Sequence, residues 1–310
     1  MGVLGSILDA IGNTPLVELT RVVPAGSARV LIKLEYFNPT GSYKDRMARA
    51  MIEGAEARGN LVPGVTVVEY TGGSTGSSLA FVCAVKGYSL TIVTSDAFAP
   101  EKLRTMAAFG ADLVIEPSEG GQITPDLIPR MMERAKEIVA GGSAYATDQF
   151  RNHDMLDGYA GIADELLADL DGGIDAFCGG VGTGGMVIGV SRAFKSRQVT
   201  TRIVGVEPAS SPVLSAGRKG SHRIEGVGIG FAPPLLQDGD LDEVLAIDES
   251  DARTMARRLA REEGILAGTS SGMNVTAALQ IARDLGPGKT VVTVAVDTGL
   301  KYLTGDLFSG

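Results

Sequence analysis

Continuous apolar runs recur along this chain of 310 residues, and helical patterns separate them. Seven runs are typical of strands, and they cover residues 28–35, 65–70, 90–94, 111–115, 174–178, 201–207 and 290–296. Runs without polar alternation fit strands that are covered on both faces, as parallel sheets require. Between them, apolar residues three and four positions apart, such as Met47, Met51 and Ala55, mark one face of a helix. The alternation predicts an α/β fold with open, twisted, mostly parallel sheets and flanking helices.

Glycine clusters lie between the apolar runs, where the chain leaves a strand and enters a helix. The chain has 42 glycines, and they follow no collagen-like period. In open α/β sheets, ligands bind at the carboxyl ends of the strands. We therefore expect several tight, ligand-facing loops that converge in one cleft.

Charge and composition argue against several classes of function. The net charge of −9 disfavours nucleic acid as a partner, because binding to a phosphate backbone needs a concentrated basic face. No window approaches the roughly 20 apolar residues of a membrane span, so we expect a cytoplasmic protein and no membrane partner. Cys83 and Cys178 lie in apolar patterns and are expected to be free core thiols. With two histidines and no ligand-spaced cluster, no metal site is predicted.

Lys44 stands in the segment NPTGSYKDR, between a predicted strand and a predicted helix. In the first helical turn its amine would lose a proton readily, because the positive end of a helix disfavours a further cation. A neutral amine is the form that attacks an aldehyde to give an imine. The alternative is that Lys44, Asp45 and Arg46 form an ordinary solvated first turn.

The segment IDAFCGGVGTGGMVIGVSRAF predicts a strand, a glycine loop and a helix. The backbone amides of residues 182–185 can surround a phosphate, and the helix dipole adds to the attraction. Gly180, Gly182 and Gly185 also satisfy the pattern G-x-G-x-x-G, and Glu207 ends the next strand. This is the dinucleotide fingerprint, so a nicotinamide-dependent oxidoreductase is an alternative, although it leaves the other loops without a role.

Two further loops are rich in hydroxyl groups and precede helices. The first, which follows a strand ending at Tyr70, consists of Thr71, Gly72, Gly73, Ser74 and Thr75. Amides and hydroxyls at a helix N-terminus suit a small carboxylate. The second loop contains Thr269, Ser270 and Ser271, and by itself it is typical of an N-cap.

Seven segments together resemble the cysteine synthase family of fold-type II pyridoxal-phosphate enzymes, with its relatives cystathionine β-synthase and threonine dehydratase. They span nearly the whole chain and read IGNTPLVEL, NPTGSYKDR, GYSLTIVTSD, GVGTGG, VGVEP, REEGILAGTSSG and DTGLKYL. Separate motifs that agree on one cofactor are far more specific than a lone glycine motif. The resemblance implies a tryptophan synthase β-like fold with two mostly parallel sheets, and pyridoxal 5'-phosphate as cofactor.

The resemblance also implies roles for single residues. Lys44 looks like the Schiff-base lysine, and Ser270 looks like the neutral partner of the pyridine nitrogen, which favours elimination at the β-carbon over racemisation. The remaining cofactor-binding residues that it implies are Ser74, Gly182, Thr183, Gly184, Gly185 and Met186. The substrate-binding residues that it implies are Thr71, Gly72, Gly73, Ser74, Thr75, Gln149 and Gly226.

Three of these positions depart from the family pattern. Gly72 stands where the family has a serine near the substrate, and Ser74 stands where it has an asparagine on the cofactor ring oxygen. Met186 replaces a hydroxyl residue that closes the phosphate loop, so the loop keeps its amides and loses one donor. The departures bear on the choice of substrate and leave the identity of the cofactor unchanged.

The function that the resemblance implies is β-replacement on an O-activated serine, such as O-acetylserine or O-phosphoserine. The freed Lys44 amine removes the α-proton, the β-leaving group departs, and sulfide or another nucleophile adds to the aminoacrylate. The product is cysteine or a related β-substituted alanine. Two alternatives stay open: β-elimination, as in a cysteine desulfhydrase or a serine or threonine dehydratase, and a non-catalytic member that binds an amino acid or a partner.

The resemblance finally implies two domains and a homodimer. The larger, cofactor-binding domain would comprise residues 1–36 and 150–310, and the smaller domain of residues 37–149 would close on the substrate carboxylate. Closure would exclude water from the reacting intermediate. The expected partners are a small amino acid and a small nucleophile.

Overall fold

The structure, a computed structural model, describes residues 2–122, 124 and 126–309. The chain divides into two compact units, which we describe separately. The first unit contains the chain up to Ile11 and Lys44–Gly158, and the second contains Gly12–Tyr43 and the chain from Tyr159 onward. The domain boundaries predicted from the sequence, with 37–149 as a mobile closing domain, stay a prediction.

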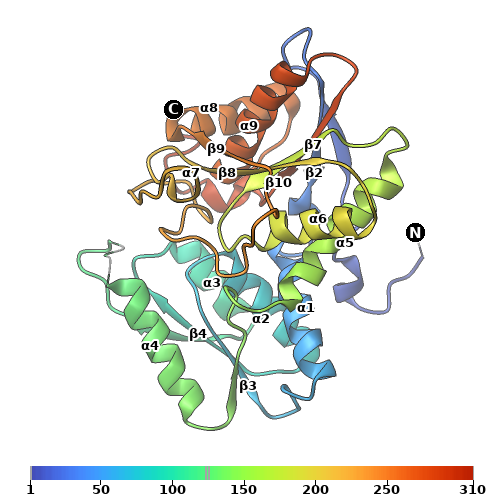
Figure 1. The fold of residues 1–310 in the computed structure, drawn as a ribbon. Coiled ribbons are helices and arrows are strands. Elements are labelled where there is room, and N and C mark those ends of the chain that lie inside the picture. Colours follow the sequence, from blue (N-terminus) through green and yellow to red (C-terminus); the bar gives the residue numbers. More distant parts are fainter. Residues whose placement is uncertain (1, 123, 125, 310) are drawn as a thin grey trace. The chain divides into compact units, whose positions relative to one another are not determined.

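The second unit is built on a six-stranded sheet (Figure 1). In spatial order its strands are β1 (Leu16–Leu19), β2 (Arg29–Leu34), β10 (Thr290–Ala295), β7 (Ala176–Gly180), β8 (Arg202–Pro208) and β9 (Glu243–Ile247). All neighbouring strands pair in parallel except β1, which is antiparallel to β2. Central strands are buried on both faces, as β7 illustrates with its five buried residues, and this accounts for the continuous apolar runs of the sequence.

Helices and short turns complete the second unit. The helices are α5 (Asp154–Asp169), which begins in the first unit, α6 (Gly185–Ser196), α7 (Val213–Ala216), α8 (Glu249–Arg258) and α9 (Thr269–Leu285). The short helical turns are η2 (Glu35–Phe37), η3 (Leu259–Glu263) and η4 (Gly299–Tyr302). In α9, Val275, Ala278 and Ala282 join a buried cluster with sheet residues such as Val291, so this face of the helix packs in the core.

The first unit is built on a four-stranded parallel sheet (Figure 1). Its strands are, in spatial order, β5 (Asp112–Glu116), β4 (Leu90–Ser95), β3 (Thr66–Tyr70) and β6 (Ala144–Ala146). Its helices are η1 (Ile7–Ala10), α1 (Lys44–Ala57), α2 (Ser74–Lys86), α3 (Pro100–Ala108) and α4 (Leu127–Ala140).

Helices cover both faces of this smaller sheet. Val68 and Val93 pack with α4 residues, among them Leu127 and Met131, in one buried cluster. Val67 is equally buried but points to the opposite face, because successive strand residues alternate. The predicted α/β class with mostly parallel sheets is therefore confirmed.

The structure adds elements that the sequence patterns did not include. Each of the seven predicted runs overlaps a strand, but β1, β6 and β9 were not among them. The helix α3 ends at Ala108, and Gly110, just beyond it, has a left-handed φ of 90°. In the part of the chain that the structure describes, no helix is both long and apolar enough to cross a membrane.

Candidate active site

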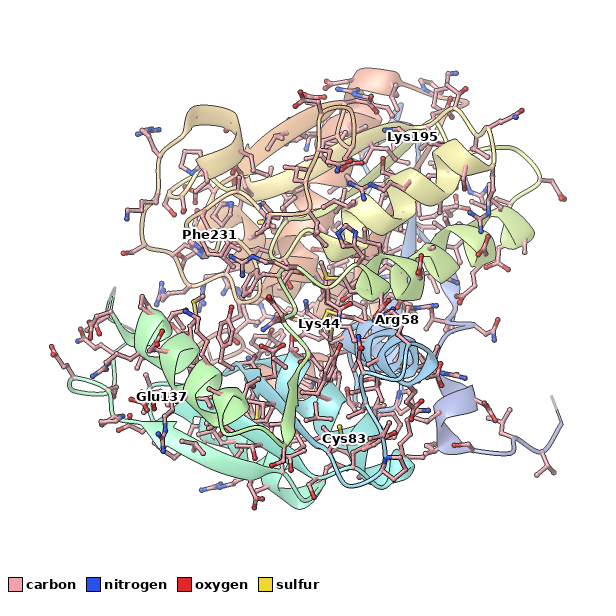
Figure 2. The ribbon with its side chains drawn as sticks, turned by 60° about the horizontal axis from the view of Figure 1, so that its bottom comes forward. Lys44, Arg58, Cys83, Glu137, Lys195 and Phe231 are labelled. Carbon is pink, nitrogen blue, oxygen red and sulfur yellow. The ribbon has the colours of Figure 1, made fainter. Side chains whose placement is uncertain are left out.

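Lys44 is the first residue of α1, so its predicted place in the first helical turn is confirmed. Met47 and Met51 anchor the same helix in the core. Lys44, Asp45 and Arg46 are only 8%, 0% and 6% exposed. The alternative of a solvated first turn is therefore wrong. Figure 2 labels Lys44, the first residue of this helix, and Arg58, which directly follows its last residue.

The loop from Thr71 to Thr75 connects β3 to α2. The Gly73 amide donates to Thr71 Oγ1 at 3.1 Å, and Gly73 is the N-cap residue of α2. A glycine cap has no side chain that could accept the amides of the first turn. Such an end of a helix binds small anions. The loop has the geometry that a carboxylate site needs.

Gln149, which follows β6, joins this loop through its side chain. Thr75 Oγ1 donates to Gln149 Oε1 at 2.8 Å, and both residues are buried. The structure thus brings together two residues, 74 positions apart, that were both predicted to bind the substrate. Their role in binding stays a prediction.

An aromatic ring explains the glycine at position 72. A Cβ atom on Gly72 would lie closer than 3.0 Å to three ring atoms of Phe98. Phe98 belongs to the segment between β4 and α3, and it packs on the cluster that contains Val68 and Val93. The ring therefore occupies the space that a side chain at position 72 would need.

Replacing Gly72 by serine is expected to lower the free energy of unfolding by about 1–3 kcal/mol, because the ring must leave a packed cluster. The double variant Gly72→Ser/Phe98→Ala should lose less than the two single changes together. Urea unfolding measures both effects. Gly73→Ser is the control, since nothing lies within 4 Å of a Cβ there. A Gly72→Ser protein as stable as this control would contradict the assignment.

The glycine loop of the second unit connects β7 to α6. Among the described residues, none accepts a hydrogen bond from the amides of Gly182, Thr183 or Gly184. These amides stand at the N-terminus of α6, where the helix dipole favours a negative charge. Thr183 adds a hydroxyl and is buried. The loop is therefore a ready site for a phosphate group.

Gly226 and Met186 lie against this loop in different ways. A Cβ on Gly182 would lie closer than 3.0 Å to the carbonyl oxygen of Gly226, so the two backbones pack directly together. The end of the Met186 side chain lies under the loop, where a Cβ on Gly179 would collide with it. Met186 can therefore offer a ligand its backbone amide, while its side chain belongs to the core. The predicted ligand contacts of both residues stay predictions.

Ser270 lies in the first turn of α9 and is 2% exposed. Its hydroxyl has no hydrogen-bond partner among the described residues, so it is available to a ligand. One turn later, Asn274 Oδ1 accepts the Gly180 amide at 2.8 Å, and its Nδ2 donates to the Val294 carbonyl at 3.0 Å. The Asn274 side chain thus holds the start of the glycine loop against the helix that carries Ser270. Sequence reasoning missed this residue, although an amide on a buried helix face was a usable signal.

Glu207 has a structural role at the end of β8. Its carboxylate accepts hydrogen bonds from Leu214 N at 2.8 Å, and from Ser215 N and Oγ at 2.9 and 2.6 Å. Glu207 thereby caps the short helix α7, and it is 2% exposed. In a dinucleotide site the Glu207 carboxylate would bind the ribose. Here it already accepts hydrogen bonds from the protein's own amides and hydroxyl.

Cys83 and Cys178 are both free and buried, as predicted, and burial raises the pKa of each thiol to about 12. Such thiols are poor nucleophiles because the thiolate is the reactive form. Within the described residues, no group of three histidine, cysteine or carboxylate side chains is arranged to hold a metal ion.

The sequence matches the model of the family described as "Pyridoxal-phosphate dependent enzyme" over residues 7–297. The chain belongs to this family. It is 42% identical over 311 residues to a cysteine synthase of Staphylococcus aureus, a match that covers 98% of this chain and 97% of the relative. A cysteine synthase (OASS) structure from Entamoeba histolytica has a TM-score of 0.93 at 36% identity, covering 100% of this chain and 92% of that one. An O-ureido-L-serine synthase structure has a TM-score of 0.91 at 37% identity, covering 100% and 96%.

These matches confirm the predicted resemblance to cysteine synthases and the predicted cofactor, pyridoxal phosphate. The alternative of a nicotinamide-dependent oxidoreductase is therefore wrong, and the chain is an enzyme of the pyridoxal-phosphate class. The residues present fit the group: the glycine loop offers a phosphate three amides that have no partner in the described part of the chain, and Ser270 offers a neutral hydroxyl. Bound pyridoxal phosphate supplies a ring that withdraws electrons from the α-carbon of an amino acid.

Proposed function

We propose that this enzyme catalyses β-replacement on an O-activated serine, with O-acetylserine and sulfide as the first substrates to test. The similarity to the Staphylococcus aureus cysteine synthase over nearly the whole of both chains carries this proposal. In the reaction, the bond between the β-carbon and the activated oxygen breaks and acetate leaves. Sulfide then forms the new bond to the β-carbon, which gives cysteine.

We assign Lys44 two tasks in this reaction. Its amine holds the cofactor covalently before the substrate arrives. The same amine removes the proton from the α-carbon of the substrate and later returns it. The buried first turn of α1 suits both tasks, because it holds the Lys44 side chain away from solvent.

The other site residues bind and orient. The amides of Gly182, Thr183 and Gly184 hold the cofactor phosphate, and the Ser270 hydroxyl pairs with the ring nitrogen. The loop from Thr71 to Thr75 and Gln149 bind the substrate α-carboxylate through amides, hydroxyls and one side-chain amide. Ser74, Met186 and Gly226 remain candidates for further contacts with the cofactor or the substrate.

The test is a product assay on the purified holoenzyme. With O-acetylserine and sulfide we expect cysteine as the main product, and we expect slower turnover when O-phosphoserine replaces O-acetylserine. A parallel reaction with cysteine alone should release little pyruvate. Pyruvate and sulfide from cysteine as the dominant products would contradict β-replacement and favour a lyase.

We further propose that the enzyme is cytoplasmic and, as the family resemblance implies, a homodimer. Its small substrates require no nucleic acid or membrane partner. Sedimentation of the holoenzyme gives the mass of the assembly directly, and a monomer across the working concentration range would contradict the dimer.

A further inference from the structure

We propose that Glu69 is a positioning residue that ties Gln149 and the Thr71–Thr75 loop into one rigid carboxylate site. The inference rests on the proposed function, since it deepens the role given there to this loop. Glu69 lies at the fourth position of β3, in the apolar run TVVEY. It is 2% exposed. A carboxylate in a buried strand needs a reason, because burial of a charge costs free energy unless the charge is compensated.

Three donors surround the Glu69 carboxylate. Oε2 accepts hydrogen bonds from the Thr147 hydroxyl at 2.7 Å and from the backbone amide of Gln149 at 3.0 Å. Oε1 accepts one from the backbone amide of Tyr70 at 2.9 Å. Two of the donors come from the segment after β6, and the third is the residue that leads into the Thr71–Thr75 loop. Each bond is charge-assisted and so stronger than a neutral one. The carboxylate therefore joins the ends of two neighbouring strands.

The bonds of Glu69 determine where the Gln149 side chain points. With its backbone fixed, Gln149 accepts from Thr75 Oγ1 through Oε1 at 2.8 Å and donates from Nε2 to the Tyr70 carbonyl at 3.4 Å. An amide nitrogen carries two hydrogens. The second hydrogen has no acceptor among the described residues, and it is the one that we assign to the substrate carboxylate.

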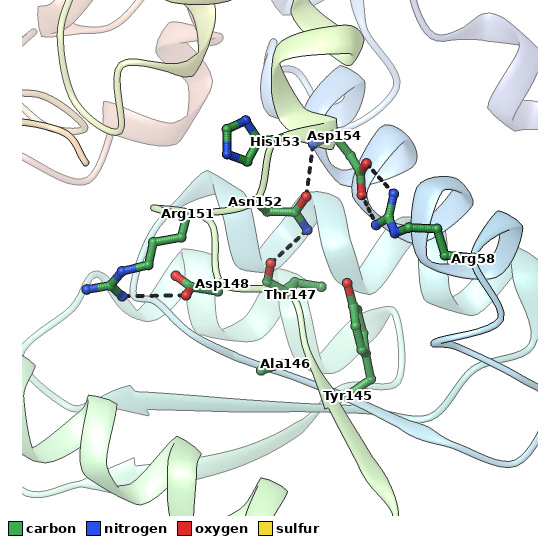
Figure 3. A pocket seen from close by; sticks show the side chains of 9 residues that line it. All are labelled: Arg58, Tyr145, Ala146, Thr147, Asp148, Arg151, Asn152, His153 and Asp154. Atoms are coloured by element: carbon green, nitrogen blue, oxygen red, sulfur yellow. Dashed lines mark hydrogen bonds and ion pairs between the residues drawn. The ribbon is translucent and has the colours of Figure 1, made fainter. Parts of the chain in front are cut away.

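Neighbouring side chains brace the same two segments. The rings of Tyr70 and Phe150 are stacked with centroids 6.2 Å apart. Asn152 Nδ2 donates to the Thr147 carbonyl at 2.9 Å, and Asn152 Oδ1 accepts the Asp154 amide at 3.0 Å (Figure 3). The adjoining pocket shows two ion pairs, Arg58 with Asp154 and Arg151 with Asp148. We therefore assign this pocket to support of the loop and propose no second ligand there.

The cost of keeping Glu69 charged is visible in its pKa. The pKa of Glu69 is raised to about 7. Burial is the main cause of the rise and Asp148 adds to it, while the three hydrogen bonds act in the opposite direction. An apolar side chain of similar size in the strand would avoid this cost. We therefore infer that the charged side chain serves to position Gln149 and the Thr71–Thr75 loop. Because both oxygens are occupied by these donors, Glu69 acts through Gln149 and not on the substrate itself.

The test compares two ligands that differ only in the carboxylate, L-alanine and ethylamine, by the change that each causes in the visible absorbance of the holoenzyme at pH 8.5. Glu69→Leu removes both acceptor oxygens and so all three hydrogen bonds, and we expect its affinity for L-alanine to fall about tenfold or more. Its affinity for ethylamine should change less than twofold. Glu69→Gln keeps one acceptor oxygen and should recover most of the loss, leaving about a threefold deficit.

Glu116→Leu and Glu116→Gln, at the end of β5 in the same sheet, are the matched controls. Equal binding of L-alanine by the wild type and both Glu69 variants would overturn the inference, and so would equal losses for both ligands. If Glu69→Leu does not fold, a Glu69→Gln protein without a selective deficit is sufficient to overturn it. A wild-type holoenzyme whose spectrum responds to no amino acid would instead count against the proposed function.

Discussion

A Gly182→Ala variant is expected to bind pyridoxal phosphate about 100-fold more weakly than the wild type. Its new Cβ would collide with the carbonyl oxygen of Gly226, and both colliding groups belong to backbone segments that cannot rotate away. The loop must therefore shift, and the shift displaces the amides of Gly182, Thr183 and Gly184 from the positions in which they can bind the phosphate. Titration of the apoprotein with the cofactor, followed by absorbance, measures the change.

Gly172→Ala is the matched control for this experiment. Gly172 also lies in a loop of the second unit, but nothing lies within 4 Å of a Cβ there. Its variant should bind the cofactor like the wild type. If Gly182→Ala also keeps wild-type affinity, the phosphate is bound elsewhere, and our assignment of the glycine loop is wrong.

A Lys44→Ala variant is expected to lose activity by on the order of 10³-fold or more, because it lacks the base that removes the α-proton. It should still bind pyridoxal phosphate, because the glycine loop and Ser270 are unchanged. Lys44→Arg should be equally inactive, since a guanidinium stays protonated and cannot serve as a base. Turnover with a saturating amount of cofactor is the measurement.

Lys136→Ala, which removes an exposed lysine of α4, is the control and should be fully active. Activity of Lys44→Arg near the wild-type level would show that a positive charge is enough, and it would exclude Lys44 as the base. Activity of Lys44→Ala within tenfold of the wild type would have the same consequence.

The fold could be predicted wherever a strand is buried on both faces. The strands β2, β7 and β10 are mostly apolar, and all their residues are buried except Arg29 and Thr290. By contrast, β1 and β9 are edge strands with partly exposed residues, and β6 has three residues. Such short or half-exposed strands leave a weaker pattern in the sequence, although the half-exposed edge strand β5 was among the predicted runs.

The loops of the site could be predicted because each is a local pattern of glycines and hydroxyl residues next to a helix. What joins the loops could not be predicted in this way. Glu69 meets Thr147 and Gln149 across 78 and 80 positions, and Asn274 meets Gly180 across 94. A charged residue inside the run TVVEY was a signal that something must compensate it, but the partners are fixed only by the pairing of β3 with β6.

The central claim is that Lys44 carries the cofactor. The most direct measurement is reduction of the purified, pyridoxal-phosphate-supplied protein with borohydride, followed by proteolysis and mass spectrometry. We expect one modified peptide, with the added mass on Lys44. An adduct on another lysine, or no adduct in protein that is saturated with the cofactor, would contradict the account.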